Sequence, residues 1–513
     1  MGMVRYLMPA MLGLGLSLAP ASDPAFGRAR QGRAAEPLCR RPASLPAMPP
    51  EPISLQPDQG PIAGAPTSPL PSPPAPPPAA VAADGTVMVT GSRMRRPSLE
   101  SAAPITVVNG TEIATAPGDT INELPAMSTR SSPATRPAPS SEGLQAGQLT
   151  AGDYDDLLNP ELYARYVRTM VNREGYDEVP LVNTRRILTV RVQDEAGRAI
   201  PFSDVTLTCA DGNRLTLATL ADGTAVFFPE FDRLGRSVRL SVAGAAPGAE
   251  RHIGFTSQAG AQQQTVTLAD PAPRVARFDL AVVLDTTGSM GDELEYLKSE
   301  LRAILADISR AHPELDIHLA LVAYRDEGDE YVTRTFPFTG QLDRIQEDLR
   351  AQRSDGGGDE PEAMDQALQR ALALDWRPQA VRTLLLVADA PPHRENVART
   401  WAAAELARAR RIQIVPVAAS GVEDLAQYVM RAMAAATQSR YLFLTDDSGI
   451  GNPHAEPSVD CYLVTRLNRL VRRVLDSQIS GRRVEPRDGE IIRTVGRYDN
   501  GRCILPPDYG DRD

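Results

Sequence analysis

The stretch FDLAVVLDTTGSM, residues 278–290, determines the fold class predicted for this chain. Apart from Asp279 it begins as an apolar run, with Pro273 before it and Gly288 near its end. A run of this length between turn residues indicates a strand that is buried on both faces of a parallel sheet. The run stops at Asp285, so this carboxylate is predicted at the carboxyl end of the strand.

Hydroxyl side chains follow this carboxylate in the next loop. Thr287 and Ser289 stand at alternate positions, and the glycines beside them allow a tight turn. Their oxygens and that of Asp285 can therefore converge on one point, and such donors suit Mg²⁺, Ca²⁺ or Mn²⁺ rather than zinc. The string Asp285-Thr-Thr287-Gly-Ser289 resembles the metal-ion-dependent adhesion site of von Willebrand factor A (VWA) domains, whose pattern is Asp-x-Ser/Thr-x-Ser. Taken alone, the same residues also suit a solvated strand-to-helix turn with a capping hydroxyl.

Strands alternate with helical patterns from about residue 275 to 480. This alternation predicts a doubly wound α/β domain with a mostly parallel sheet, the Rossmann-like fold that the VWA resemblance also implies. Binding sites in such sheets lie at the carboxyl ends of the strands. Further strands are predicted at 317–324, 381–388, 412–419 and 441–444, and helices at 294–308, 361–374, 395–409 and 425–436.

The remaining ligands come from two more segments. Asp389 follows an apolar strand, and the loop DGGGDEPE at 355–362 opens a helix. VWA domains take their other ligands from a Gly-rich loop and from an Asp of this kind, but the usual loop threonine is missing here. Asp359 is the preferred replacement, and Glu362 parallels the Pro-Glu ligand of integrin β subunits or serves as a first-turn helix carboxylate. The predicted metal ligands are Asp285, Thr287, Ser289, Asp359, Glu362 and Asp389.

The segments Tyr324-Arg-Asp326 and Ala388-Asp-Ala-Pro-Pro-His393 complete the VWA resemblance. His393 stands alone, so we expect a loop or core contact rather than a metal ligand. Asp326 and Glu327 are candidate bases, but no nucleophile with a paired base and no known catalytic motif accompanies them. The prediction is therefore no enzyme and no cofactor besides the metal. The resemblance implies a protein partner that offers an Asp or Glu to the ion.

Residues 186–270 change to an apolar period of two, with turns between short runs. This pattern predicts a small antiparallel β-sandwich. The strings Asp-x-x-Gly-x-x-Ile-Pro at 194–201 and Asp-Gly-x-Ala-x-Phe-x-Pro at 222–229 resemble carboxypeptidase-regulatory-like modules. Such modules are spacers or binding platforms.

The N-terminal region is predicted to be disordered apart from its start. Residues 1–21 have the basic, apolar and small-residue parts of a secretory signal peptide, with an unremoved anchor as the alternative. Residues 22–148 form a Pro-rich linker. Within this linker, residues 87–108 resemble the start of the plug domain of TonB-dependent receptors, although no barrel follows. The alternative interpretation of this segment is two weak strands in a flexible region. We therefore expect an exported protein of the periplasm or cell surface.

Two segments flank the predicted domains. Residues 149–185 are predicted to be helical, with Asp153, Asp155 and Asp156 as a helix cap or, alternatively, a cation site. The stretch from Cys461 predicts a basic amphipathic helix that packs on the sheet or, alternatively, lies on a membrane. A tail follows at 481–513.

The four cysteines predict one disulfide. Cys461 and Cys503 bracket the last helix and are the expected pair in an exported chain. Cys39 and Cys209 are less easily paired, and Cys209 is expected to be free inside the sandwich.

Charge and composition limit the partners. The 513 residues carry a formal net charge of −11 and no concentrated basic patch, which excludes nucleic acid. The sequence thus predicts an exported envelope protein that binds a protein partner through a divalent metal. The alternatives are a structural envelope component without metal-dependent binding, and a metal-assisted hydrolase.

Overall fold

The computed structural model describes residues 38–39, 147–171, 182–255, 260–292, 294–358, 360–419, 421–450, 457 and 459–496. The predicted signal peptide, the plug-like segment at 87–108 and most of the predicted linker lie outside these residues. So do Asp359 and Cys503.

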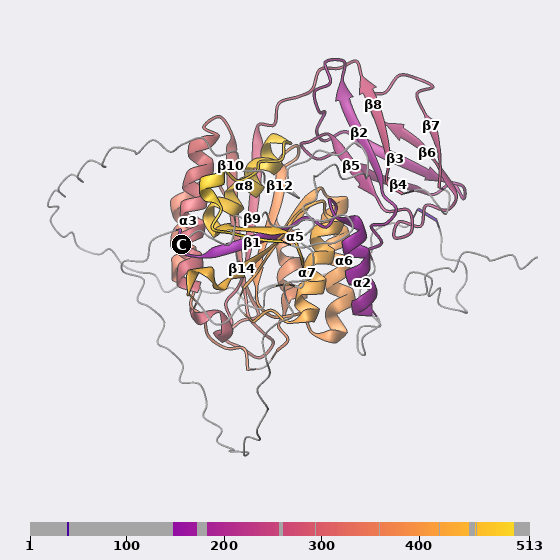
Figure 1. The fold of residues 1–513 in the computed structure, drawn as a ribbon. Helices are drawn as coiled ribbons and strands as arrows, with labels where there is room; N and C mark the ends of the chain where they lie inside the picture. Colours follow the sequence, from indigo (N-terminus) through magenta and orange to yellow (C-terminus); the bar gives the residue numbers. More distant parts are fainter. Residues whose placement is uncertain are drawn as a thin grey trace, which may run out of the picture.

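A nine-stranded sheet forms the centre of the molecule, in the order β11-β10-β9-β12-β13-β14-β1-β15-β16. Its middle strands run parallel, as predicted. Eight of the nine residues of β9 are buried, because helices cover both faces of this strand (Figure 1). The parallel strands are β9 (Arg277–Asp285), β10 (Asp316–Tyr324), β12 (Val381–Ala388), β13 (Ile412–Ala418) and β14 (Tyr441–Thr445).

The helices form a layer on each face of the sheet. Alternate residues of β9 point to opposite faces, so that Leu280 and Val282 belong to one core cluster and Ala281 and Val283 to the other. One face is covered by α3 (Leu294–Ala311), α4 (Leu342–Ala351) and α8 (Leu467–Ser480). The other face is covered by α2 (Pro160–Val171), α5 (Met364–Ala373), α6 (Val397–Ala409) and α7 (Asp424–Ala436). The predicted α/β fold is therefore confirmed.

The prediction of a purely helical segment at 149–185 is wrong, because its first residues form β1 (Thr150–Tyr154). This strand lies antiparallel between β14 and β15 (Tyr462–Arg466). Gly152 is required there, since a Cβ would lie 2.6 Å from the ring of Phe443. Glycine and aspartate are poor strand formers, so the strand depends on the two edges that it joins rather than on its own propensity.

The predicted tail at 481–513 also contributes to the sheet, through β16 (Arg493–Val495). At the opposite edge β11 (Thr333–Thr339) runs antiparallel to β10. As predicted, α8 packs on the sheet, with its apolar side buried in the core. Short 3-10 turns lie at η1 (Gly288–Asp292), η2 (Arg394–Asn396), η3 (Asp446–Ser448) and η4 (Asp488–Glu490).

The three aspartates before α2 neither cap that helix nor form a cation site. The helix starts at Pro160, and each aspartate pairs with a different arginine. The pair between Asp156 and Arg431 is 2.7 Å long and buried on both sides. These pairs hold β1 and the turn after it against elements that lie 275 to 328 positions later in the chain. They are Asp156–Arg431, Asp153–Arg440 and Asp155–Arg483.

A two-sheet sandwich lies between α2 and β9, where a sandwich was predicted, but it is inserted into the α/β domain rather than placed before it, because β1 belongs to the central sheet (Figure 1). It is mixed rather than wholly antiparallel, because its last strand runs parallel to its first. Alternation of apolar residues predicts strands but not their directions. One sheet has the order β5-β2-β8 and the other β4-β3-β6-β7. The strands are β2 (Leu188–Asp194), β3 (Asp204–Cys209), β4 (Arg214–Ala218), β5 (Thr224–Phe227), β6 (Ser237–Val242), β7 (Arg251–Gly254) and β8 (Gln262–Leu268).

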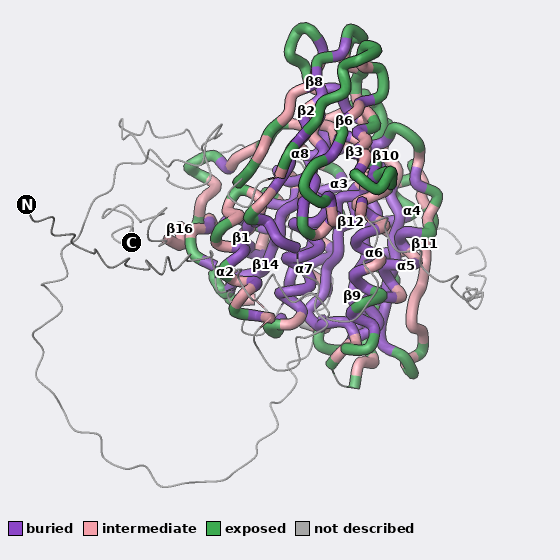
Figure 2. The backbone as a smooth tube through the Cα atoms, turned by 90° about the vertical axis from the view of Figure 1, so that its right-hand side faces the viewer, coloured by how far each residue is buried: buried purple, intermediate pink, exposed green. Residues whose placement is uncertain are grey.

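The sandwich packs against the end of the large sheet at which the parallel strands begin. Arg408 near the end of α6 donates to the carboxylate of Asp232 at 2.6 and 2.9 Å and to the carbonyl of Val226 at 2.8 Å. The rings of Phe231 and Trp401 meet edge to face. The residues at this contact are mostly buried, whereas the far end of the sandwich is mostly exposed (Figure 2).

The disulfide prediction for the sandwich is wrong, because Cys39 and Cys209 are bonded to each other, with Cα atoms 5.8 Å apart. Leu38 donates its N–H to Asp211, and the N–H of Cys39 bonds to the carbonyl of Arg233. Residues 38–39 of the predicted linker are thus attached to the sandwich. A pairing over 170 positions leaves no local pattern in the sequence. Cys461 is also disulfide-bonded, and its predicted partner lies outside the described residues.

Within the described part of the chain, none of the helices combines the length and apolar character required to cross a bilayer.

Candidate metal centre

The loop after β9 brings the first predicted ligands together. The hydroxyl of Thr287 donates to Asp285 Oδ1 at 2.7 Å, and the backbone N–H of Thr287 donates to the same atom at 3.0 Å. The hydroxyls of Thr287 and Ser289 are 3.1 Å apart. Asp285 and Thr287 are buried, whereas Ser289 and Gly288 are exposed. The three oxygen-bearing side chains therefore form a short chain that runs from the sheet to solvent.

The Gly-rich loop packs directly on this first loop. Gly288 donates its N–H to the carbonyl of Gly356 at 2.9 Å. Gly357 has a φ of +61°, and a Cβ there would lie 2.7 Å from Glu362 Oε1 and 2.9 Å from Thr287 Cβ. Only glycine suits both the conformation and the space. Glu362 and Thr287 consequently both lie close to Gly357.

Glu362 also lies next to the segment that follows β12. Its N–H donates to the carbonyl of Pro391 at 3.0 Å, and it forms an isolated bridge with Pro392. The alternative of a first-turn helix carboxylate is wrong, since α5 starts at Met364 and Asp365 occupies its first turn. Asp389 is buried directly after β12, as predicted. The backbone thus places Glu362 beside the loop that carries Asp389.

Burial raises the affinity of these acidic side chains for protons, and the neighbouring carboxylates add to it. The pKa of Asp285 rises to about 6, chiefly because of burial, while hydrogen bonds from Thr287 oppose the rise. Burial raises the pKa of Glu362 to about 9, and the charges of Asp285, Asp326 and Asp389 add to it. Asp285 Oδ2 and Glu362 Oε2 are both buried, and neither accepts a hydrogen bond of normal geometry from a described residue, although the buried hydroxyl of Tyr324 lies near Asp285 and opposes the rise in its pKa. A cation would stabilise the ionised forms.

The donor set fits a hard divalent cation, because it combines carboxylate and hydroxyl oxygens. No three His, Cys, Asp or Glu side chains of the described residues come close enough to form a metal cluster by themselves. A metal would therefore depend on the hydroxyls of Thr287 and Ser289, which the structure brings to Asp285. Asp359, the preferred ligand of the Gly-rich loop, lies outside the described residues.

Two further acidic residues support these loops. Asp329, which the sequence analysis missed, accepts hydrogen bonds from the N–H groups of Asp326 and Gly357, both at 3.0 Å. The acidic string after β10 was the signal that could have indicated it. His393 lies 2.6 Å from Asp326 and so makes the loop contact that was expected. Burial disfavours the charged imidazole, but Asp326 outweighs this effect and raises the pKa of His393.

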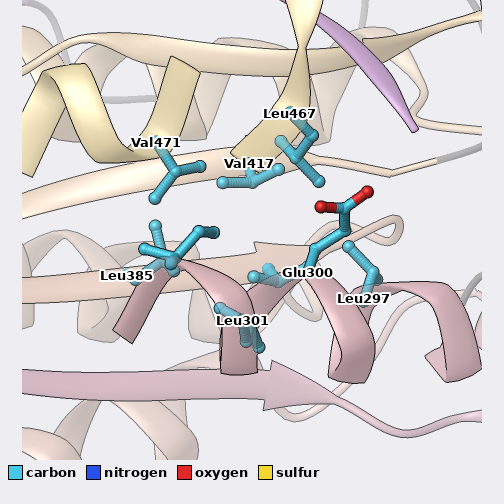
Figure 3. Close-up of a pocket in the computed structure, with 9 residues that line it drawn as sticks. Leu297, Glu300, Leu301, Leu385, Val417, Leu467 and Val471 are labelled. Carbon is cyan, nitrogen blue, oxygen red and sulfur yellow. The ribbon is translucent and has the colours of Figure 1, made fainter. Parts of the chain in front are cut away.

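A small apolar cavity lies between α3, α8 and the sheet, away from these loops (Figure 3). Its volume of about 10 Å³ is close to the space that one water molecule needs. It is therefore too small to bind a substrate. The cavity is lined mainly by leucine and valine, with the stem of Glu300 at one side (Figure 3).

Residues 279–451 match the family model for the von Willebrand factor A domain. The strands β10 to β14 and nearly all of β9, with the loops at their carboxyl ends, therefore belong to a VWA domain, a class of module that in general mediates interactions between proteins.

This chain is similar in part to curated relatives. It is 34% identical over 131 residues to a protein of Acanthamoeba polyphaga mimivirus named as an ariadne-like RING finger protein, covering 26% of this chain and 13% of that protein. It is 40% identical over 93 residues to human von Willebrand factor A domain-containing protein 7, covering 18% and 10% respectively. The match therefore spans a small part of either relative.

This chain also aligns with the solved structure of the conserved hypothetical protein BatB from Bacteroides thetaiotaomicron. The alignment covers 39% of this chain and 98% of the BatB chain. The sequence identity is 13% and the TM-score is 0.29.

Proposed function

We propose that this chain is an exported envelope protein whose VWA domain holds a divalent ion, Mg²⁺ or a similar hard cation, and binds a protein partner through it. The observation that carries the proposal is the pair of buried oxygens, Asp285 Oδ2 and Glu362 Oε2, that lack a hydrogen-bond donor among the described residues. A carboxylate in this state is costly unless a cation compensates it.

Each proposed ligand has a distinct role. Asp285 provides the main charge from the rigid end of β9, and Thr287 is oriented by its hydrogen bond to that carboxylate. Ser289 provides a hydroxyl at the exposed side. Asp389 and either Glu362 or Asp359 complete the set from the neighbouring loops. A bound ion supplies an open position for an Asp or Glu of the partner.

The metal is tested by titrating Mg²⁺ into the full chain in a calorimeter. Asp285→Ala should abolish binding, because it removes the buried carboxylate to which the hydroxyl of Thr287 donates. Asp375→Ala, at an exposed aspartate outside these loops, is the matched control and should bind like the parent. Circular dichroism checks that both variants are folded. If Asp285→Ala binds Mg²⁺ like the parent, the proposal is wrong and a structural role in the envelope replaces it.

The partner is tested by capture from an envelope extract with and without EDTA. Capture should be lost with EDTA and with Asp285→Ala, and it should persist with Asp375→Ala. Capture that is insensitive to EDTA would contradict a metal-dependent interaction.

Export is proposed from the basic start, the apolar segment and the small residues at 1–21. Sequencing of the mature N-terminus should find a start at or near Ser22. Recovery of intact Met1 in the cytoplasm would contradict export.

A further inference from the structure

Exposed acidic side chains surround the candidate metal centre. Glu327 follows β10, Asp355 and Glu360 belong to the Gly-rich loop, and Glu395 follows β12. All four are exposed, and none forms an ion pair with a residue that the structure describes. These four residues are called the acidic rim below.

Hydrogen bonds place Asp355 and Glu327 at the metal loops, and sequence position places the other two, with Glu360 two residues before Glu362. The N–H of Asp355 donates to the carbonyl of Thr286 at 3.1 Å, directly beside Asp285. Glu327 accepts a hydrogen bond from Gln366 at 2.7 Å, in the helix that follows Glu362. Glu395 stands two residues after His393, which contacts Asp326. The four residues of the acidic rim therefore lie in three loops that meet at the candidate metal centre.

The cationic side chains of these loops are largely engaged. Arg325 is buried and donates to the carbonyls of Thr286 and Arg353. Arg334 pairs with Glu330 at 2.8 Å and lies over the ring of Tyr331 at 3.8 Å. Arg394 is an exposed arginine of the same edge. The four carboxylates of the acidic rim thus outnumber Arg353 and Arg394, the exposed arginines in the described parts of these loops.

The acidic rim differs from an ordinary acidic surface in what lies at its centre. Asp285 is fully buried and Glu362 is 3% exposed, and each has one oxygen without a hydrogen-bond donor among the described residues. These inward oxygens indicate a cation, whereas the rim residues point to solvent. At this edge of the sheet, the buried oxygens therefore favour a cation, and the exposed carboxylates favour positive charge on a partner.

We propose that the partner of this site is a basic protein segment, in which one carboxylate is flanked by lysine or arginine side chains. This inference rests on the proposed function, because the carboxylate needs the ion. An acidic segment without flanking bases would meet like charge at Glu327, Asp355, Glu360 and Glu395, and such contacts disfavour association. Flanking bases convert the same contacts into attractions and speed the encounter.

Three synthetic peptides test the inference against the full chain in Mg²⁺. The first carries Lys-Lys-Gly-Asp-Gly-Lys-Lys, the second replaces each lysine by serine, and the third replaces the aspartate of the first by asparagine. At low salt the first should bind about tenfold tighter than the second, because several exposed pairs each add a few-fold. About 0.3 M salt should reduce this ratio. EDTA should weaken the first peptide to the level of the third.

The double variant Glu327→Gln/Glu395→Gln should reduce the ratio to a few-fold. Its matched control is Glu250→Gln/Glu314→Gln, two exposed glutamates outside these loops, which should leave the ratio unchanged. Mg²⁺ binding is measured by calorimetry for every variant.

The outcomes separate the two proposals. If the chain binds Mg²⁺ but the lysine and serine peptides bind equally, or neither binds, the basic partner is wrong while the metal site stands. If the asparagine peptide binds as tightly as the first, the rim acts without the ion and the inference is also wrong. If the chain binds no Mg²⁺, the proposed function fails, whatever the peptides do.

Discussion

Glu300 accepts a hydrogen bond at 2.8 Å from the backbone N–H of Gly147, which lies 153 positions earlier in the chain. The N–H groups of Gln148 and Leu149 donate to the same carboxylate. Glu300 belongs to α3, the helix that follows the metal loop, and it is almost fully buried. This contact holds the entry of β1 to the element that starts beside the candidate centre.

Removal of the charge on Glu300 should destabilise the fold. Glu300→Gln leaves the backbone donors of Gly147 to Leu149 with a weaker acceptor, so the free energy of unfolding should fall by about 1–3 kcal/mol. Urea denaturation measures the change. Glu314→Gln alters an exposed glutamate and should change the free energy by less than about 0.5 kcal/mol. Equal effects of the two variants would contradict the role of Glu300.

Stability without metal should depend on pH through Asp285 and Glu362. Their pKa values in the folded protein, about 6 and about 9, lie above the ordinary values of 3.8 and 4.5. The folded state therefore binds protons more tightly than the unfolded chain, and this stabilisation is lost as the pH rises through those values. In EDTA the urea midpoint should fall between about pH 5 and about pH 9.

Mg²⁺ should oppose this loss, because it competes with protons for the same oxygens. We expect Mg²⁺ to raise the urea midpoint more at about pH 8 than at about pH 5. Calorimetry in two buffers of different ionisation enthalpy should also detect protons released on binding. A Mg²⁺ effect that is the same at both pH values would contradict the assignment of these carboxylates as ligands.

The buried pair between Asp156 and Arg431 should be among the most sensitive contacts of the domain. Arg431 also lies over the ring of Tyr166 at 3.8 Å. Arg431→Met leaves a buried carboxylate without its partner, which should cost about 3–5 kcal/mol of unfolding free energy. The control Arg274→Met breaks an exposed pair with Glu314 and should cost about 1 kcal/mol or less. Similar losses in both variants would show that burial does not determine the effect.

The disulfide between Cys39 and Cys209 should be found by peptide mapping under non-reducing conditions. Cys39→Ser should release residues 38–39 from the sandwich and lower its stability by about 2–4 kcal/mol, as measured by urea denaturation. A free thiol at Cys209 in the oxidised parent protein would contradict this pairing.

Much of the VWA domain followed from local sequence patterns. The strand β12 was predicted with its observed limits, and β9, β10, β13 and β14 nearly so, because a largely apolar run between turns leaves few alternatives. The proximity of Asp285, Thr287 and Ser289 was predictable for the same reason, since they lie within five positions of each other in one loop. Asp389 was found because parallel strands end at one edge.

Other features depend on partners far away in the sequence. The segment Thr150–Tyr154 has weak strand propensity and became β1 because β14 and β15 each offered an open edge. Cys39 and Cys209 pair only because the sandwich brings them together. Glu362 was placed beside Asp389 by a bridge to Pro392 rather than by its own helix.

The sequence alone therefore determined which segments form the α/β core and which loop carries the candidate ligands, because hydrophobic period and turn residues act over a few positions. Only the tertiary structure decided where β1, Glu362, Asp329 and Cys39 lie. Their positions depend on hydrogen bonds and on a disulfide with residues that are distant in the sequence and become neighbours only in the folded chain.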